Sequence, residues 1–141
     1  APEFTSFGNI AAIEILDNPD ATGLNTTATV AKFIKSSGSE TWAGAYFEVA
    51  EPLDLNNYKK IMVKTYSPKS GIEVLLKLEN DDASVEYEIP VTNTSADAWE
   101  NLVFDFTDAP EAEFMRIVIF FDFGTVGDDS VYYFDEIELT N

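Results

Sequence analysis

Short segments of alternating apolar and polar residues recur along the whole chain, and clusters of turn-forming residues separate them. An alternation with a period of two residues is typical of half-buried β-strands, because successive side chains of a strand point to opposite faces of its sheet. The separating stretches include NPD, SSGSE, SPKSG, ENDD and TVGDD. No segment long enough for a surface helix has an apolar stripe of helical period. The sequence therefore predicts an all-β fold, an antiparallel β-sandwich that is jelly-roll-like.

The pattern predicts ten strands in a single domain. We expect these strands at residues 4–7, 11–17, 27–35, 41–49, 58–66, 71–79, 84–91, 98–106, 114–123 and 131–139. A chain of 141 residues has the usual size of one domain, and a hydrophobic content of 45% is enough to form a core. We therefore expect residues 1–141 to form one module, excised from a larger multi-domain protein.

The chain is strongly acidic, with 26 Asp and Glu residues, 8 Lys and Arg residues and a formal net charge of −18. Charge repulsion opposes binding to nucleic-acid phosphates and to anionic lipid headgroups, so we expect no nucleic-acid partner. No apolar run approaches the roughly 18 residues that a membrane span needs, so we expect no membrane insertion. The charge favours a neutral ligand or a cation.

The chain contains neither cysteine nor histidine. Without cysteine there are no disulfides and no thiol nucleophile, and without histidine the most common general base and transition-metal ligand are missing. The remaining metal ligands are the oxygen atoms of Asp and Glu, which suit calcium or magnesium.

Four of the strand sequences, TWAGAYFEV, KIMVKTY, IEVLLKLEN and RIVIFFDFG, divide by parity into a core set and an opposite set. The expected core residues are Ala43, Ala45, Phe47, Val49, Ile61, Val63, Ile72, Val74, Leu76, Leu78, Ile117, Ile119, Phe121 and Phe123. The opposite sets, which we expect on one second face, include Trp42, Tyr46, Met62, Lys64, Tyr66, Glu73, Leu75, Lys77, Glu79, Arg116, Val118, Phe120 and Asp122. Large rings beside long charged side chains are unusual on a merely solvated sheet face. Trp42 and Tyr46 flank Gly44, where a flat ligand could approach the backbone.

Four stretches cover most of the chain from about residue 13 to the end: NPDATGLNTTATVAKFIKSSGSETWAGAYFEV, IMVKTYSPKSGIEVLLKLEN, AWENLVFDF and RIVIFFDFGTVGDDSVYYFDEIELT. They resemble the β-sandwich carbohydrate-binding modules of marine Bacteroidetes, which are attached to laminarinases and related glycosidases or belong to cell-surface glycan-binding proteins. The ending VYYFDEIEL also resembles the final strand of binding modules in families 4, 16 and 22. The resemblance implies a concave glycan-binding face, a secreted or cell-surface location, associated with the outer membrane through the parent protein, and often a structural calcium.

The resemblance implies non-catalytic polysaccharide binding, with a neutral β-glucan such as laminarin, a β-1,3-glucan, as the expected ligand. Aromatic rings stack on the C–H faces of sugars, and planar polar groups hydrogen-bond the hydroxyls. The candidate ligand-binding residues are Trp42, Tyr46, Lys64, Tyr66, Glu73, Lys77, Glu79, Arg116 and Asp122. In the alternative interpretation, the charged residues form cross-strand ion pairs and the rings lie under a loop or a neighbouring domain. Trp99 is either a second sugar platform or an end plug of the core.

Calcium is the expected cofactor, as a structural ion. The loop DNPDATGLN contains several side-chain oxygen ligands, and backbone carbonyls could complete the roughly six to eight that calcium takes. Asp135 shares a predicted strand face with Tyr133, Ile137 and Leu139, and a carboxylate on an apolar face needs a cation or hydrogen-bond donors. The candidate metal ligands are Asp20, Asn25 and Asp135. The alternative is an Asx-turn in the loop and a hydrogen-bonded Asp135.

Two other functions are open to a chain of this composition. One is an adhesion or spacer domain of a surface protein, whose aromatic face packs on a neighbouring domain. The other is a small glycosidase, which needs two carboxylates about 5–5.5 or 6.5–9.5 Å apart. Among 26 acidic residues such pairs arise by chance, so their presence does not indicate catalysis. We therefore expect a binding module and not an enzyme.

Overall fold

The computed structural model describes residues 3–141 and confirms the all-β prediction, with strands and no helix in this range. The strands are, in chain order, β1 (Thr5–Phe7), β2 (Glu14–Asp17), β3 (Thr29–Lys35), β4 (Gly44–Glu48), β5 (Lys60–Tyr66), β6 (Glu73–Asn80), β7 (Glu86–Thr92), β8 (Trp99–Asp105), β9 (Phe114–Phe121) and β10 (Ser130–Thr140). Every predicted strand is present, and its ends lie within a few residues of the predicted ones. The described residues contain no helix that could cross a membrane.

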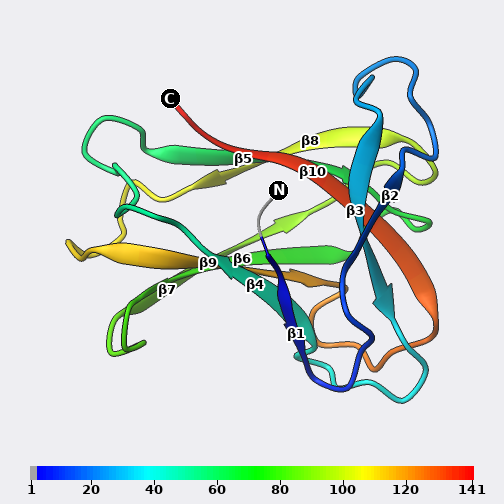
Figure 1. Ribbon diagram of the computed structural model, residues 1–141, viewed down its shortest axis with the longest axis horizontal. Coiled ribbons are helices and arrows are strands. Elements are labelled where there is room, and N and C mark those ends of the chain that lie inside the picture. Colours follow the sequence, from blue (N-terminus) through cyan, green and yellow to red (C-terminus); the bar gives the residue numbers. More distant parts are fainter. Residues whose placement is uncertain (1–2) are drawn as a thin grey trace.

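The strands form two antiparallel five-stranded sheets that face each other. Sheet A has the order β1-β4-β9-β6-β7, and sheet B has the order β2-β3-β10-β5-β8. Figure 1 shows the two layers, with β5, β8 and β10 in one and β4, β6, β7 and β9 in the other. Most neighbours within a sheet are far apart in sequence, so the chain crosses repeatedly between the layers, as in a jelly-roll-like sandwich.

The core lies between the inner faces of the two sheets. Sheet A contributes Ala45, Val74, Leu76, Leu78, Ile117, Ile119 and Phe121, and sheet B contributes Ala31, Phe33, Ile61, Val63, Leu102, Phe104, Tyr132 and Phe134. The Phe121 and Tyr132 rings stack across the two layers with centroids 4.8 Å apart. The predicted core is confirmed at its buried positions, and Phe47 and Val49 are partly buried against it.

The prediction that Phe123 belongs to the core is wrong, because the backbone breaks the alternation after β9. Asp122 has a φ of 51°, in the left-handed region that non-glycine residues seldom adopt. The side chain of Phe123 consequently packs edge-on against Phe120, with centroids 5.3 Å apart. Both rings belong to a small apolar cluster outside the main core.

A β-bulge divides β10 and changes which side chains share a face. The pairing of β10 with β5 shifts register between Asp135 and Glu138, and Glu136 has a φ of 47°. Asp135 pairs with Lys64 on the outer face of sheet B, whereas Ile137 and Leu139 pack against the main core. The predicted common face of Asp135, Ile137 and Leu139 is therefore wrong.

A second apolar cluster lies on the outer face of sheet A. Its buried members are Leu75, Val118 and Phe120, and its partly buried members are Phe7, Tyr46 and Phe123. A Cβ atom placed on Gly44 would lie 2.8 Å from both Phe7 Cζ and Phe120 Cδ2. These two rings occupy the space above Gly44, so the expected approach of a flat ligand to the backbone at this glycine is wrong.

Gly44→Ala should therefore destabilise the sandwich by about 1–3 kcal/mol, the usual cost of an extra methyl group in a filled space. Urea denaturation of the parent and the variant measures this difference. In a Phe7→Leu background the contact with Phe7 Cζ is absent, so Gly44→Ala should lower the free energy of unfolding by a smaller amount. A Gly44→Ala protein as stable as its parent would contradict the tight packing above this glycine.

Candidate functional site

Most of the predicted ligand-binding residues lie on the outer face of sheet A. They are Trp42, Tyr46, Glu73, Lys77, Glu79 and Arg116. Tyr46 and Lys77 flank Val118 in register, and Glu48 and Glu79 flank Arg116. Two rows of side chains therefore cross β4, β9 and β6. One row is centred on the apolar Val118 and the other on the guanidinium of Arg116.

The prediction that Lys64 and Tyr66 share this face is wrong. Both lie on β5, which pairs with β8 and β10 in sheet B, so their side chains point away from the core on the opposite side of the molecule. Parity separates inside from outside, but it does not tell which of the two outer faces a strand supplies. Tyr66 packs edge-on against Trp99 and Tyr133, with centroids 5.6 and 5.8 Å apart, and Lys64 forms an ion pair with Glu136.

Asp122 also lies outside the predicted face. Its carboxylate accepts a hydrogen bond of 3.1 Å from Lys69 Nζ, which also donates to Asp128 at 2.8 Å. Hydrogen bonds from Lys69 and Ser130 lower the pKa of Asp128 to about 2. These contacts join the loops that follow β5 and β9, so Asp122 has a structural partner at the end of the sandwich.

Trp42 is the most exposed aromatic side chain of this face, with half of its surface open to solvent. Its ring stacks on Phe7, with centroids 6.3 Å apart and planes 16° from parallel. Phe7 in turn meets Phe120 edge-on at 5.7 Å. Trp42 thus has a supported inner face and an open outer face, which is the arrangement that stacking on a sugar requires.

Arg116 covers one side of the Tyr46 ring, its guanidinium carbon 5.1 Å from the ring centroid. The same guanidinium donates to Glu79 at 2.9 Å and lies 3.6 Å from Glu48. Burial would raise the pKa of Glu79, but hydrogen bonds from Arg116 and Lys77 outweigh this effect and lower it. Tyr46 is therefore fixed beside an ionised pair, and it offers less stacking surface than Trp42.

Lys77 links the charged and aromatic parts of the face. Its ammonium lies 5.7 Å from the Phe120 centroid, 3.1 Å from Glu79 and 3.6 Å from Glu86. The cross-strand ion pairs that formed the alternative interpretation are thus present. Ion pairing does not prevent ligand binding, because a sugar hydroxyl can accept from Lys77 and donate to a carboxylate without breaking the pair.

A hollow of about 400 Å³ beside Tyr46 is lined by Glu3, Phe4, Thr5, Tyr46 and Glu48.

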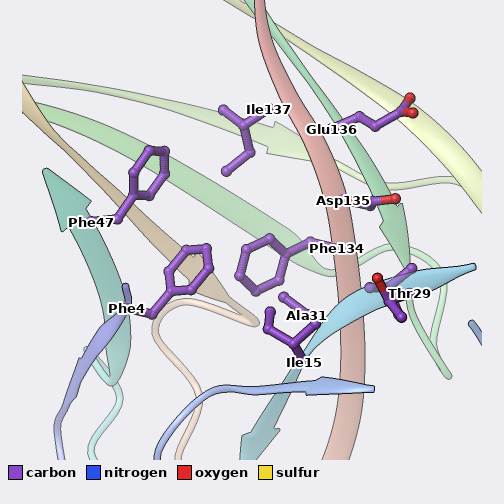
Figure 2. A pocket seen from close by; sticks show the side chains of 10 residues that line it. Phe4, Ile15, Thr29, Ala31, Phe47, Phe134, Asp135, Glu136 and Ile137 are labelled. Carbon is purple, nitrogen blue, oxygen red and sulfur yellow. The ribbon is translucent and has the colours of Figure 1, made fainter. Parts of the chain in front are cut away.

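A different pocket, of about 290 Å³, opens between the edges of the two sheets. Figure 2 shows the side chains of Phe4, Phe47, Phe134 and Ile137 around it, and the carboxylates of Asp135 and Glu136 pointing away. Its wall is mainly apolar and supplies few groups that could hydrogen-bond a sugar hydroxyl. The outer face of sheet A is therefore the better candidate for a polar ligand.

Sequence reasoning missed Phe7, which forms the floor under Trp42. Phe7 ends β1, a three-residue strand at the edge of sheet A, and it pairs with Gly44. A strand this short carries almost no periodic signal, so its parity could not be assigned. The close approach of Phe7 to Gly44 explains the glycine between Trp42 and Tyr46.

Trp99 is buried, but not as an end plug of the main core. It lies on the outer side of sheet B opposite Tyr66, and the loop between β2 and β3 covers it. Its indole N–H donates to Asn18 Oδ1 at 3.1 Å and to the Asp20 carbonyl at 3.0 Å. A ring in this position is not open to a sugar, so the second-platform alternative is wrong.

The structure brings together two of the three predicted calcium ligands. Asp135 Oδ2 accepts hydrogen bonds from Asn25 Nδ2 at 3.2 Å and from Thr27 Oγ1 at 2.5 Å. The Asp20 carboxylate instead accepts from Thr22, and these hydrogen bonds lower its pKa. Within residues 3–141 no three acidic side chains are grouped to hold a metal ion. The observed hydrogen bonds satisfy Asp135 as the alternative interpretation expects, and calcium binding stays a prediction.

No protein-family model and no curated protein matches the sequence. Among solved structures, a family 30 carbohydrate-binding module has a TM-score of 0.67 at 11% identity, over 100% of this chain and 92% of that chain. A family 61 module in complex with β-1,4-galactotriose has a TM-score of 0.60 at 15% identity, over 98% and 88%. The family 11 module of a Clostridium thermocellum cellulosomal cellulase has a TM-score of 0.63 at 10% identity, over 100% and 89%. This chain has the β-sandwich fold of carbohydrate-binding modules.

Proposed function

We propose that this chain is a non-catalytic carbohydrate-binding module that holds a polysaccharide on the outer face of sheet A. The half-exposed ring of Trp42, supported from below by Phe7, is the observation that carries the proposal. A pyranose stacked on this ring would have the hydroxyl-bonding groups of Arg116, Glu79 and Lys77 on the same face. The fold shared with solved carbohydrate-binding modules supports this function.

The proposed ligand is a neutral glycan, with β-glucan such as laminarin as the first choice. Carboxylates outnumber cations on the outer face of sheet A, and the net charge of −18 repels polyanions at a distance. The preference for a β-1,3-glucan rests on the resemblance of the sequence to laminarinase-associated modules. The same resemblance supports a secreted or cell-surface location within a larger protein.

The runner-up is an adhesion or spacer domain, and the apolar pocket between the sheet edges favours it, since a neighbouring domain could fill that pocket. Affinity gels with laminarin, mixed-linkage glucan, cellulose, xylan and agarose separate the possibilities when a reducing-sugar assay runs in parallel. Retardation without release of reducing sugar supports the binding module. Release of reducing sugar indicates a glycosidase. The absence of both retardation and reducing-sugar release on every gel favours the spacer.

Trp42→Ala should lower the affinity for the bound glucan by about tenfold or more and leave the fold intact. A stacked aromatic contributes about 0.5–1.5 kcal/mol beyond its area burial, and the lost contact area adds to this. Titration calorimetry and thermal melting of the same variant measure the two effects.

Two variants serve as controls for this prediction. Tyr58→Ala removes another exposed ring, 42% accessible, from the segment between β4 and β5, and Tyr66→Phe removes a hydroxyl from the outer side of sheet B. Both should bind like the parent protein. A loss of affinity in Tyr66→Phe together with full binding by Trp42→Ala would move the site to the other sheet.

Binding should also depend little on ionic strength. A neutral glucan releases no counterions, and the ion pairs of the face stay formed when it binds, so the dissociation constant should change less than about twofold between about 50 and 500 mM salt. Titrations at both salt concentrations test this. A steep loss of affinity would point to an anionic glycan with Lys77 and Arg116 as its main contacts.

We further propose a structural calcium ion near Asp135, whose carboxylate lies beside the fully buried Asn25. A chelator should then lower the melting temperature without removing glycan binding, because Asp135 lies on sheet B, away from Trp42. A metal that binds only the folded state stabilises it by about 2.7 kcal/mol at a hundredfold excess over its dissociation constant. Asp135→Ala should remove the calcium-dependent part of the melting shift. Melting that does not respond to calcium in metal-stripped buffer would contradict the site.

A further inference from the structure

Lys35, the last residue of β3, has no solvent exposure although its side chain ends in a cation. Its Nζ atom donates to the backbone carbonyl of Asp122 at 2.5 Å and to that of Thr41 at 3.3 Å. Burial lowers the pKa of Lys35, and the nearby charge of Asp122 partly offsets this effect. Burying a cation is unfavourable unless its donors are satisfied, and here backbone carbonyls are the observed acceptors.

The two carbonyls belong to two loops that carry rings of the outer face, Trp42 in one loop and Phe123 in the other. Thr41 immediately precedes Trp42, and Asp122 immediately precedes Phe123, which packs against Phe120. Each carbonyl is one peptide unit away from a ring of this surface. A donor group that holds both carbonyls limits how far either ring can move.

The two loops are also bonded to each other around Lys35. The amide of Gly124 donates to the Thr41 carbonyl at 3.1 Å, so this carbonyl accepts from both the backbone and the ammonium. The amide of Gly127 donates to the Ser39 carbonyl at 3.1 Å, and a Cβ atom on Gly127 would lie 1.8 Å from the Ser36 carbonyl oxygen. The loops are thus in close backbone contact, and Lys35 joins them from the core side.

We propose that Lys35 is a positioning residue for the ligand platform: its buried ammonium holds the loops at residues 36–43 and 122–129 together and thereby sets the position of Trp42. An apolar side chain of equal length would fill the same volume without the cost of a buried cation, but it could not donate to the carbonyls. The role in ligand binding rests on the proposed function, whereas the joining of the loops does not.

The first test is Lys35→Met in a Trp99→Phe background, where Trp42 is the one remaining tryptophan of the two in the chain. Three quantities are measured: exchange of the Gly124 amide, acrylamide quenching of Trp42 fluorescence, and affinity for laminarin. We expect Gly124 exchange to rise about tenfold or more, quenching to change, and affinity to fall about tenfold, while amides of the β6–β9 ladder stay protected. The matched control is Leu78→Ala, a core truncation on β6 that should lower the melting temperature without changing the other readouts.

A chemical rescue separates the ammonium from the volume of the side chain. The chain has no cysteine, so Lys35→Cys can be alkylated selectively in the unfolded state. An aminoethyl group rebuilds a lysine-like ammonium, and a propyl group gives an apolar chain of the same length. The aminoethyl protein should regain Gly124 protection and laminarin affinity, and the propyl protein should not.

The proposal has two parts, the joining of the two loops by Lys35 and the effect of this joining on ligand binding, and the outcomes distinguish them. Equal Gly124 exchange and Trp42 quenching in the aminoethyl and propyl proteins would overturn it, as would a propyl protein that does not fold at all, because Lys35 would then serve the whole fold. Loosened loops with unchanged laminarin affinity would overturn the link to the ligand. If the parent protein binds none of the glucans, the proposed function fails, and the exchange and quenching data still decide whether Lys35 joins the loops.

Discussion

The structure depends on the burial of two alternating apolar sets between facing sheets. With no cysteine in the chain, no covalent crosslink assists this packing, and the contact of Phe121 with Tyr132 joins the central strands of the two layers. Both outer faces are then free to carry other side chains. Within residues 3–141, the outer face of sheet A combines an exposed aromatic ring with a paired charge network, so the division between core and outer face also sets the place of the proposed ligand site.

The outer face of sheet A is organised before any ligand arrives. Arg116 and Lys77 are held by carboxylates on neighbouring strands, and their positions over Tyr46 and Phe120 bring the polar groups close to the rings. Side chains that are already ordered lose less conformational entropy when a ligand binds. The pairs of Glu79 with Arg116 and Lys77 are partly buried, and the cost of desolvating the charges offsets much of their attraction. This network is therefore better understood as preparation for hydrogen bonding than as a source of folding energy.

The strands and most core positions were predictable because a period of two residues is visible in the sequence. The sheet to which Tyr66 belongs was not predictable. Its strand pairs with strands far away in the chain, and the alternation of side chains looks the same in either sheet. The positions of Phe123 and Asp135 depend on single backbone angles at Asp122 and Glu136, which residue type does not reveal. The paired partners of Asp122 and the floor provided by Phe7 are likewise contacts between distant segments.

The floor under Trp42 belongs to the least anchored strand of the sandwich. β1 contributes three residues to sheet A and pairs on one side only, with β4. Edge segments with few pairings open locally at a much smaller free-energy cost than the whole domain. Detachment of this strand would remove Phe7 and leave the central strands of both sheets intact. A preparation can therefore be fully folded by circular dichroism or calorimetry and still contain molecules whose platform is temporarily dismantled. Because such an opening is reversible, it would raise the apparent dissociation constant of the proposed site and leave the melting temperature nearly unchanged.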